Sequence, residues 1–170
     1  MKNLMLPLIL LVACLYVGCT ADQKPIDSRS GILYATSFES SEDFIAFRGH
    51  GHAISDQVPP AAGDSSLLIS GGCIGEHWTL SLGPYEQDKL VSISFLGMSE
   101  EHRECGYLSL CLPHAGICEP ISIDGEGTWK EYKSLEPFLV LANDTLKIVG
   151  ESGGKQSCLT YVDRLVVEEL

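Results

Sequence analysis

Residues 89–97 read KLVSISFLG, and this run is the clearest indication of the fold class. Val91, Ile93 and Phe95 alternate with serines, which is the pattern of a β-strand with one buried face and one solvated face. Similar short runs recur between Gly, Pro, Ser and Asp, and none after residue 30 sustains the 3.6-residue period of a helix. We therefore expect about eight to ten strands over residues 31–170, packed as a two-sheet β-sandwich.

A hairpin is expected just downstream of this stretch. A strand over 107–112 turns through PHAG at 113–116 and returns over 117–123, which places Cys111 opposite Cys118. Directly opposed residues of a non-hydrogen-bonded pair come close enough for a disulfide. A loop this short would stabilise the domain by about 2.5 kcal/mol in the chain-entropy model. The alternative is a pair of free thiols.

The first eighteen residues predict an export signal. Lys2 supplies a short positive region, and residues 4–18 carry no charge but are too few for a comfortable transmembrane helix. Small residues before a cysteine resemble the lipobox of bacterial lipoproteins, in which that cysteine is lipidated. Cys19 is favoured over Cys14 because its signal has the better length and a polar stretch follows at once. The alternative is a cleaved secretory signal with an ordinary cysteine nearby.

This signal sets the organisation and the location of the chain. We expect a signal peptide over 1–18, a flexible tether over 19–30 and one domain over 31–170, lipid-anchored in the bacterial cell envelope and facing the periplasm or the exterior. The chain carries 11 basic and 23 acidic residues, a formal net charge of −12. This balance argues against nucleic acid or an anionic membrane surface as a partner, so membrane contact is expected through the N-terminal lipid.

Five segments in order resemble the galactose-binding-like β-sandwich, as found in carbohydrate-binding modules of the CenC-like group. They are FES at 38–40, GDSSLLISGG at 63–72, KLVSISFLG at 89–97, GTWKEY at 127–132 and YVDRLVV at 161–167. Their order and spacing match along nearly all of residues 31–170. The resemblance implies an all-β jelly-roll and a non-catalytic module that binds a glycan or another surface ligand.

The same resemblance implies a structural calcium ion. Its ligands would be the carboxylates of Glu39 and Asp163, with backbone oxygens near Asp64 and Ser65. Calcium takes about six to eight oxygens, and it would neutralise an aspartate that lies between apolar neighbours in a strand. The alternative is a solvent-facing Asp163 and a Glu39 that belongs to a turn.

Five cysteines lie beyond the tether, and in an exported protein they indicate disulfides before metal ligands. Their spacing contains no CxxC pair, which argues against zinc. In the resembled family the strand SLLIS and the final strand are antiparallel neighbours. Aligning Ser66 with Leu165 then brings Cys73 to Cys158 and leaves Cys105 over.

Sugar binding needs exposed aromatic rings with polar side chains beside them. Trp78 is a candidate because it stands where a loop enters a strand. Tyr85 lies in the turn GPYE, and Tyr107 shares a strand face with a serine and a cysteine, although each also has a structural interpretation. Trp129 occupies a position that is usually core in the resembled family. The glycan hypothesis predicts an exposed aromatic patch that includes Trp78.

Other chemistry has less support. His50 and His52 flank a glycine and could chelate copper or zinc, with an ordinary glycine-rich surface loop as the alternative. The sequence contains no nucleophile elbow, zinc-protease motif or phosphate-cradling loop, so we expect no enzyme activity. The leading hypothesis is a non-catalytic glycan-binding lipoprotein. The second is a structural or protein-interaction lipoprotein of an envelope complex, and the third is a copper- or zinc-binding envelope protein.

Overall fold

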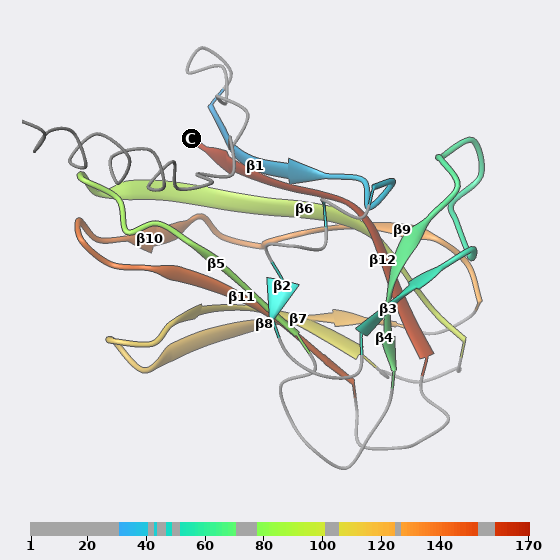
Figure 1. The fold of residues 1–170 in the computed structure, drawn as a ribbon. Coiled ribbons are helices and arrows are strands. Elements are labelled where there is room, and N and C mark those ends of the chain that lie inside the picture. Colours follow the sequence, from blue (N-terminus) through green and yellow to red (C-terminus); the bar gives the residue numbers. More distant parts are fainter. Residues whose placement is uncertain are drawn as a thin grey trace, which may run out of the picture.

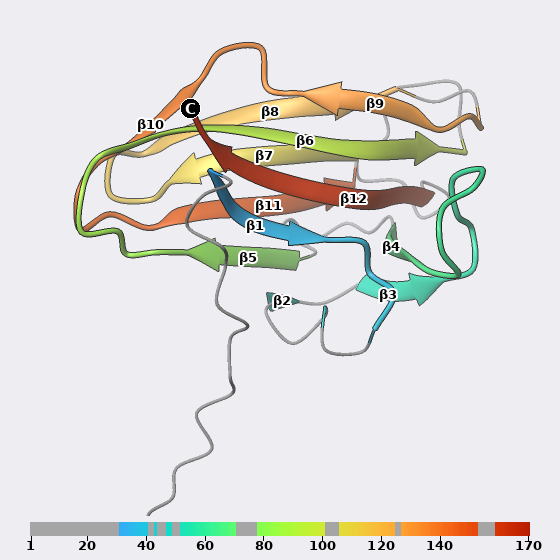
Figure 2. The same cartoon turned by 90° about the horizontal axis from the view of Figure 1, so that it is seen from above.

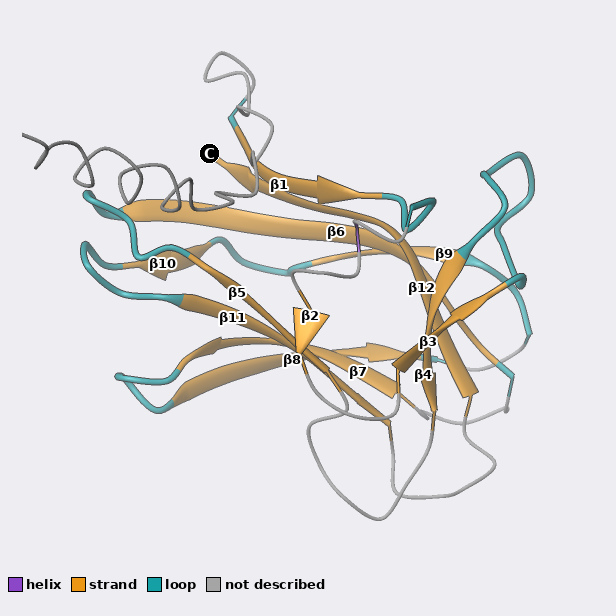
Figure 3. Ribbon diagram, viewed as in Figure 1, coloured by secondary structure: helices purple, strands orange, loops and turns teal. Residues whose placement is uncertain are grey.

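The computed structural model describes residues 31–40, 43, 47–48, 52–70, 78–100, 106–124, 127–152 and 159–170. In this part of the chain the regular structure is twelve antiparallel β-strands in two sheets, without an α-helix (Figure 1, Figure 3). The strands are β1 (Ile32–Thr36), β2 (Phe47–Arg48), β3 (His52–Ser55), β4 (Ser66–Ser70), β5 (Trp78–Leu82), β6 (Lys89–Ser99), β7 (Gly106–Leu112), β8 (Ile117–Ile123), β9 (Lys130–Lys133), β10 (Phe138–Val140), β11 (Leu146–Ser152) and β12 (Leu159–Glu169). The expected all-β sandwich is confirmed.

Seven strands form one sheet and five form the other. The seven-stranded sheet has the order β10-β6-β12-β4-β3, with β1 paired to β12 and β9 paired to β6. The five-stranded sheet has the order β2-β5-β11-β7-β8. Figure 2 shows the long strands β6 and β12 side by side, with β1 on the side of β12 that faces away from β6.

Alternation along each strand decides which face is buried. In β6 the residues Val91, Ile93 and Phe95 point between the sheets, and in β7 the leucines at every second position do the same. Burying one such side chain stabilises the fold by about 1.5–3 kcal/mol. The predicted alternation over 89–97 and 107–112 is therefore confirmed.

The pairing of β4 with β12 differs in register from the sequence alignment. The two strands are antiparallel neighbours as expected, but Leu67 pairs with Val162, two residues away from the alignment of Ser66 with Leu165. β12 also has an irregularity between Asp163 and Val166, in its pairing with β6. Cys73, Cys105 and Cys158 lie outside the described residues, so the second disulfide stays a prediction.

The hairpin of β7 and β8 forms as expected. Cys111 pairs directly with Cys118, their Cα atoms are 4.2 Å apart, and the disulfide is present. Strand β8 is the edge of the five-stranded sheet, and its residues from Ile117 to Pro120 are exposed. The disulfide therefore ties an exposed edge strand to its neighbour.

The predicted signal peptide, tether and lipidation at Cys14 or Cys19 lie outside the described residues. His50 also lies outside them, and His52 is placed only as the first residue of β3. None of the described residues belongs to a helix long and apolar enough to cross a membrane.

Candidate functional site

The outer face of the five-stranded sheet carries side chains that point away from the core, among them polar groups and one tyrosine. In β7, Tyr107 and Ser109 point outward because the leucines between them are buried. In β11, Val149 and Glu151 point outward because Ile148 is buried. We call this surface the outer face of the five-stranded sheet.

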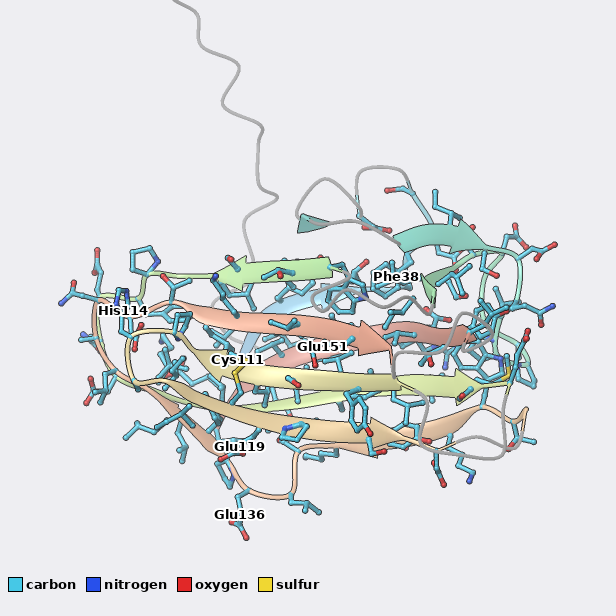
Figure 4. All side chains as sticks on the ribbon, turned by 90° about the horizontal axis from the view of Figure 1, so that it is seen from below. Phe38, Cys111, His114, Glu119, Glu136 and Glu151 are labelled. Atoms are coloured by element: carbon cyan, nitrogen blue, oxygen red, sulfur yellow. A yellow bond between two sulfur atoms is a disulfide. The ribbon has the colours of Figure 1, made fainter. Side chains whose placement is uncertain are left out.

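Strand register brings three of these side chains into one row. Tyr107 lies directly between Glu151 of β11 and Ser122 of β8. Side chains of directly opposed residues in an antiparallel sheet are about 4.5–5.5 Å apart at Cβ. Figure 4 shows Glu151 near the middle of this face and Cys111 farther along it. The phenol ring thus has a carboxylate on one side, whereas the Ser122 hydroxyl on the other side is buried.

The side chains of the next row on this face are nearly buried. Val149 pairs with Ser109, and the two are only 4% and 7% exposed although both point away from the core. The part of this face that a pyranose ring could use is the tyrosine ring with its neighbouring carboxylate, since the CH groups of a sugar pack on rings and its hydroxyls donate to oxygens.

A groove adjoins this face along the edge strand β8. Its volume is about 290 Å³, and Pro120 and Ser122 of β8 line it together with Tyr132 of β9. The Tyr132 ring stacks on Phe95 at a centroid distance of 5.3 Å, and its hydroxyl donates to Asp124. A ligand on the outer face that extends past β8 would meet this second tyrosine.

The prediction that Trp78 lies on an exposed aromatic patch is wrong. Trp78 is fully buried in the core. It pairs directly with Gly150 of β11, where an added Cβ would lie only 2.1 Å from the indole. The indole fills the space that the glycine leaves, and this cross-strand fit is invisible in the local sequence around residue 78.

Tyr85 lies at the other end of the sandwich from Tyr107. Leu82 lies three residues before Tyr85 and pairs with Leu146 of β11. Tyr107 pairs with Glu151, at the other end of β11. Leu146 and Glu151 are roughly 17 Å apart along the strand. The Tyr85 ring packs against the core, and burial raises its pKa. Tyr85 and Tyr107 therefore share no surface, and only Tyr107 stays a candidate for the outer face.

Trp129 is only partly buried, in contrast to the expected core position. It precedes β9, and its ring is tilted over Tyr161 at a centroid distance of 6.4 Å. Tyr161 points to the outside of the seven-stranded sheet and donates a hydrogen bond of 2.7 Å to Glu100. Trp129 thus covers a nearly buried tyrosine rather than filling the space between the sheets.

The residues predicted to bind calcium come together. The Glu39 carboxylate accepts a 2.7 Å hydrogen bond from the Asp64 amide, and an added Cβ on Gly63 would lie 1.9 Å from one of its oxygens. Asp163 is fully buried. Burial raises the pKa of Asp163, and the charge of Glu39 raises it further, while a hydrogen bond from the Arg164 amide opposes the rise.

These residues fit a hard cation. The Oδ2 atom of Asp163 is buried and receives no hydrogen bond from the described residues, and Glu39 adds a second negative charge nearby. A cation at this point would neutralise both groups. Among the described residues no group of three or more His, Cys, Asp or Glu side chains could hold a metal. Backbone oxygens near Asp64 and Ser65 would therefore have to complete the ligand set.

Glu151 was missed in the sequence. It stands in an ordinary polar stretch, ESGG, that carries no motif. Only the pairing of β11 with β7 places it beside Tyr107. A strand assignment for 146–152 would have predicted an outward Glu151, but not its neighbour.

No family model and no curated protein matches the sequence of this chain. Solved structures match its fold. The C-terminal family 22 carbohydrate-binding module of Clostridium thermocellum Xyn10B matches with a TM-score of 0.60 and 16% identity, over 82% of this chain and 93% of that one. The CBM22-1 xylan-binding domain of Paenibacillus barcinonensis Xyn10C matches with a TM-score of 0.58 and 15% identity, over 81% and 94%.

A third similar structure is TmCBM61 in complex with β-1,4-galactotriose. Its TM-score is 0.53 and its identity is 10%, over 75% of this chain and 90% of that one. Together these matches define the class of the fold, which is the galactose-binding-like jelly-roll that carbohydrate-binding modules use. The predicted resemblance is therefore confirmed for the fold.

Proposed function

We propose that this protein is a non-catalytic, lipid-anchored envelope protein whose domain binds a glycan on the outer face of the five-stranded sheet. The observation that carries the proposal is the direct pairing of Tyr107 with Glu151, whose side chains are both partly exposed on this face. A partly exposed ring beside a carboxylate acceptor can pack on the CH face of a sugar and accept from its hydroxyls. The likeness of the fold to xylan- and galactotriose-binding modules supports this choice.

The experiment is a glycan-array screen of the folded protein, followed by calorimetry on any glycan found. Tyr107→Ala should weaken binding by about tenfold, because a ring contact is worth about 0.5–1.5 kcal/mol beyond its buried area. Tyr107→Phe should keep most of the affinity, since it keeps the ring. Glu151→Gln should weaken binding by removing a charged acceptor.

Glu136→Gln is the matched control, because Glu136 is an exposed carboxylate away from this row (Figure 4). It should leave the affinity unchanged. Equal loss in all variants, or unchanged binding in Tyr107→Ala, would place the site elsewhere. Absence of binding across the array by a folded sample would remove the glycan function.

We also propose that calcium binds Glu39 and Asp163 with backbone oxygens near Asp64 and Ser65, as a structural ion and not a catalytic one. The support is the buried Oδ2 of Asp163 beside a second carboxylate. The ion would fix the loop that precedes β4 to the final strand β12. This placement is on the opposite sheet from Tyr107, so the ion would stabilise the domain without contacting the glycan.

The envelope location rests on the sequence alone. The apolar residues 4–18 followed by Cys19 support export and lipidation. Mass spectrometry of the mature N-terminus would test this, with an acylated Cys19 expected and an unmodified terminus contradicting it. The protein-interaction and copper- or zinc-binding functions remain predictions without a described site.

A further inference from the structure

Exposed leucines gather at one end of the outer surface of the seven-stranded sheet. Seven large apolar side chains are exposed among the described residues, and four of them lie at this end. The four are Leu90, Leu139, Leu141 and Leu170. We call them the leucine row.

Strand pairing makes the row contiguous. Leu139 of β10 pairs directly with Leu90 of β6, and the Leu170 amide donates a 2.9 Å hydrogen bond to the Leu90 carbonyl. The three are 51%, 42% and 61% exposed. Their strand neighbours Val91 and Phe138 are buried, so the leucines face outward together.

The row lies where the chain enters the domain. The Glu169 amide donates a 2.6 Å hydrogen bond to the Gly31 carbonyl, so residue 31 is next to Leu170. Figure 2 shows the C-terminal end of β12 beside the starts of β1 and β6. Thirty residues precede Gly31, and the predicted lipidation site Cys19 is only twelve residues upstream. Twelve extended residues span at most about 40 Å.

Two of the carboxylates beside the row have ammonium partners. Glu169 pairs with Lys89 at 2.6 Å, and Glu168 lies 3.6 Å from Lys133. Asp88, which accepts a 2.8 Å hydrogen bond from the Ala142 amide next to Leu141, adds a further negative charge. A zwitterionic surface carries no net charge, so even an acidic domain can bring an apolar row to it without net repulsion.

The area of the row argues against a stable dimer. Four half-exposed leucines offer on the order of a few hundred Å². A stable protein interface buries about 800 Å² per partner. A bilayer surface needs no matching partner patch, and a nearby lipid anchor makes the contact effectively intramolecular.

We propose that the leucine row contacts the surface of a zwitterionic phospholipid bilayer beside the lipid anchor and so orients the domain. This inference rests on the proposed lipidation. The candidate glycan face then points away from the membrane. Gly106, the neighbour of Tyr107 in β7, packs against Thr160 of β12. Thr160 pairs with Ser99, which is roughly 30 Å along β6 from Leu90. Tyr107 is therefore far from the leucine row.

The test uses the full-length lipidated protein in phosphatidylcholine vesicles with brominated acyl chains, which quench tryptophan on contact. Leu139→Trp places a reporter in the row. The matched control is Ile54→Trp, an equally exposed position on the distant edge strand β3. The emission of Leu139→Trp should be quenched at least about twofold more strongly than that of Ile54→Trp. Adding Leu90→Glu to Leu139→Trp should abolish the difference.

Three outcomes would overturn the proposal. Equal quenching of the two reporters in vesicle-bound, acylated protein would show that the row does not touch the bilayer, while the anchor itself stands. An unacylated N-terminus with no vesicle binding would remove the anchor and the orientation together. A dimer in sedimentation analysis that Leu90→Glu dissociates would assign the row to a second copy of the chain.

Discussion

Replacing Asp163 by asparagine should reveal whether the buried carboxylate is a metal ligand. Asp163 is fully buried, its Oδ2 receives no hydrogen bond from the described residues, and Glu39 lies close enough to raise its pKa. Without a cation this arrangement is destabilising at neutral pH. Asp163→Asn keeps the shape and removes the charge. In a chelator, the variant should therefore be at least as stable as the wild type.

The size of the calcium effect follows from linkage. Calcium at about 100 times its dissociation constant would stabilise the folded wild type by about 2.7 kcal/mol. For a domain of this length one kcal/mol corresponds to about 3–4 °C, so the melting temperature should rise by about 10 °C. Asp163→Asn should gain much less, because it offers one carboxylate fewer.

The sign of the pH dependence gives a second readout. The pKa of Asp163 is raised in the folded state, so the metal-free wild type is most stable at low pH with respect to this group. That stability is lost as pH rises through the folded-state pKa, and Asp163→Asn should lack this step. Thermal melts in chelator and in calcium, from pH 4 to 8, measure both effects. A wild type indifferent to calcium, or a variant clearly less stable than wild type in chelator, would refute the reasoning.

Three further results are expected. Gly150→Ala should lower the free energy of unfolding by about 1–3 kcal/mol in urea titrations, because its Cβ would collide with Trp78; wild-type stability would contradict the buried indole. Burial raises the pKa of Tyr34 to about 12. This tyrosine should therefore stabilise the fold below pH 10 and lose that effect as pH rises towards 12. Tyr34→Phe should remove this step from alkaline melts. Replacing Cys111 and Cys118 together by serine should cost up to about 2.5 kcal/mol, which reduction of the wild type should reproduce.

The parts of the fold that depend on local patterns could be predicted from the sequence. The serine alternation in 89–97 and the leucine alternation in 107–112 each identify a buried face without any knowledge of the partner strand. The disulfide between Cys111 and Cys118 follows in the same way, since a tight hairpin fixes its own register.

Features that depend on distant partners could not be predicted in the same way. The pairing of Leu67 with Val162 lies two residues from the alignment of Ser66 with Leu165, and nothing in the sequence YVDRLVV marks this register. The burial of Trp78 depends on a glycine seventy-two positions away in the chain, so the local sequence, a loop that enters a strand, does not indicate it. Glu151 becomes a site residue only through its pairing with Tyr107. The juxtaposition of Glu39 and Asp163 was anticipated through the family resemblance and not from spacing.

Strand β8 carries a safeguard against unwanted assembly. An unpaired sheet edge can recruit a strand from another molecule, and proteins crowded on one surface would meet edge to edge often. Pro120 interrupts this edge because it has no amide hydrogen to donate, and the neighbouring Glu119 adds a charge. The edge can therefore stay open beside the candidate glycan face without nucleating aggregates.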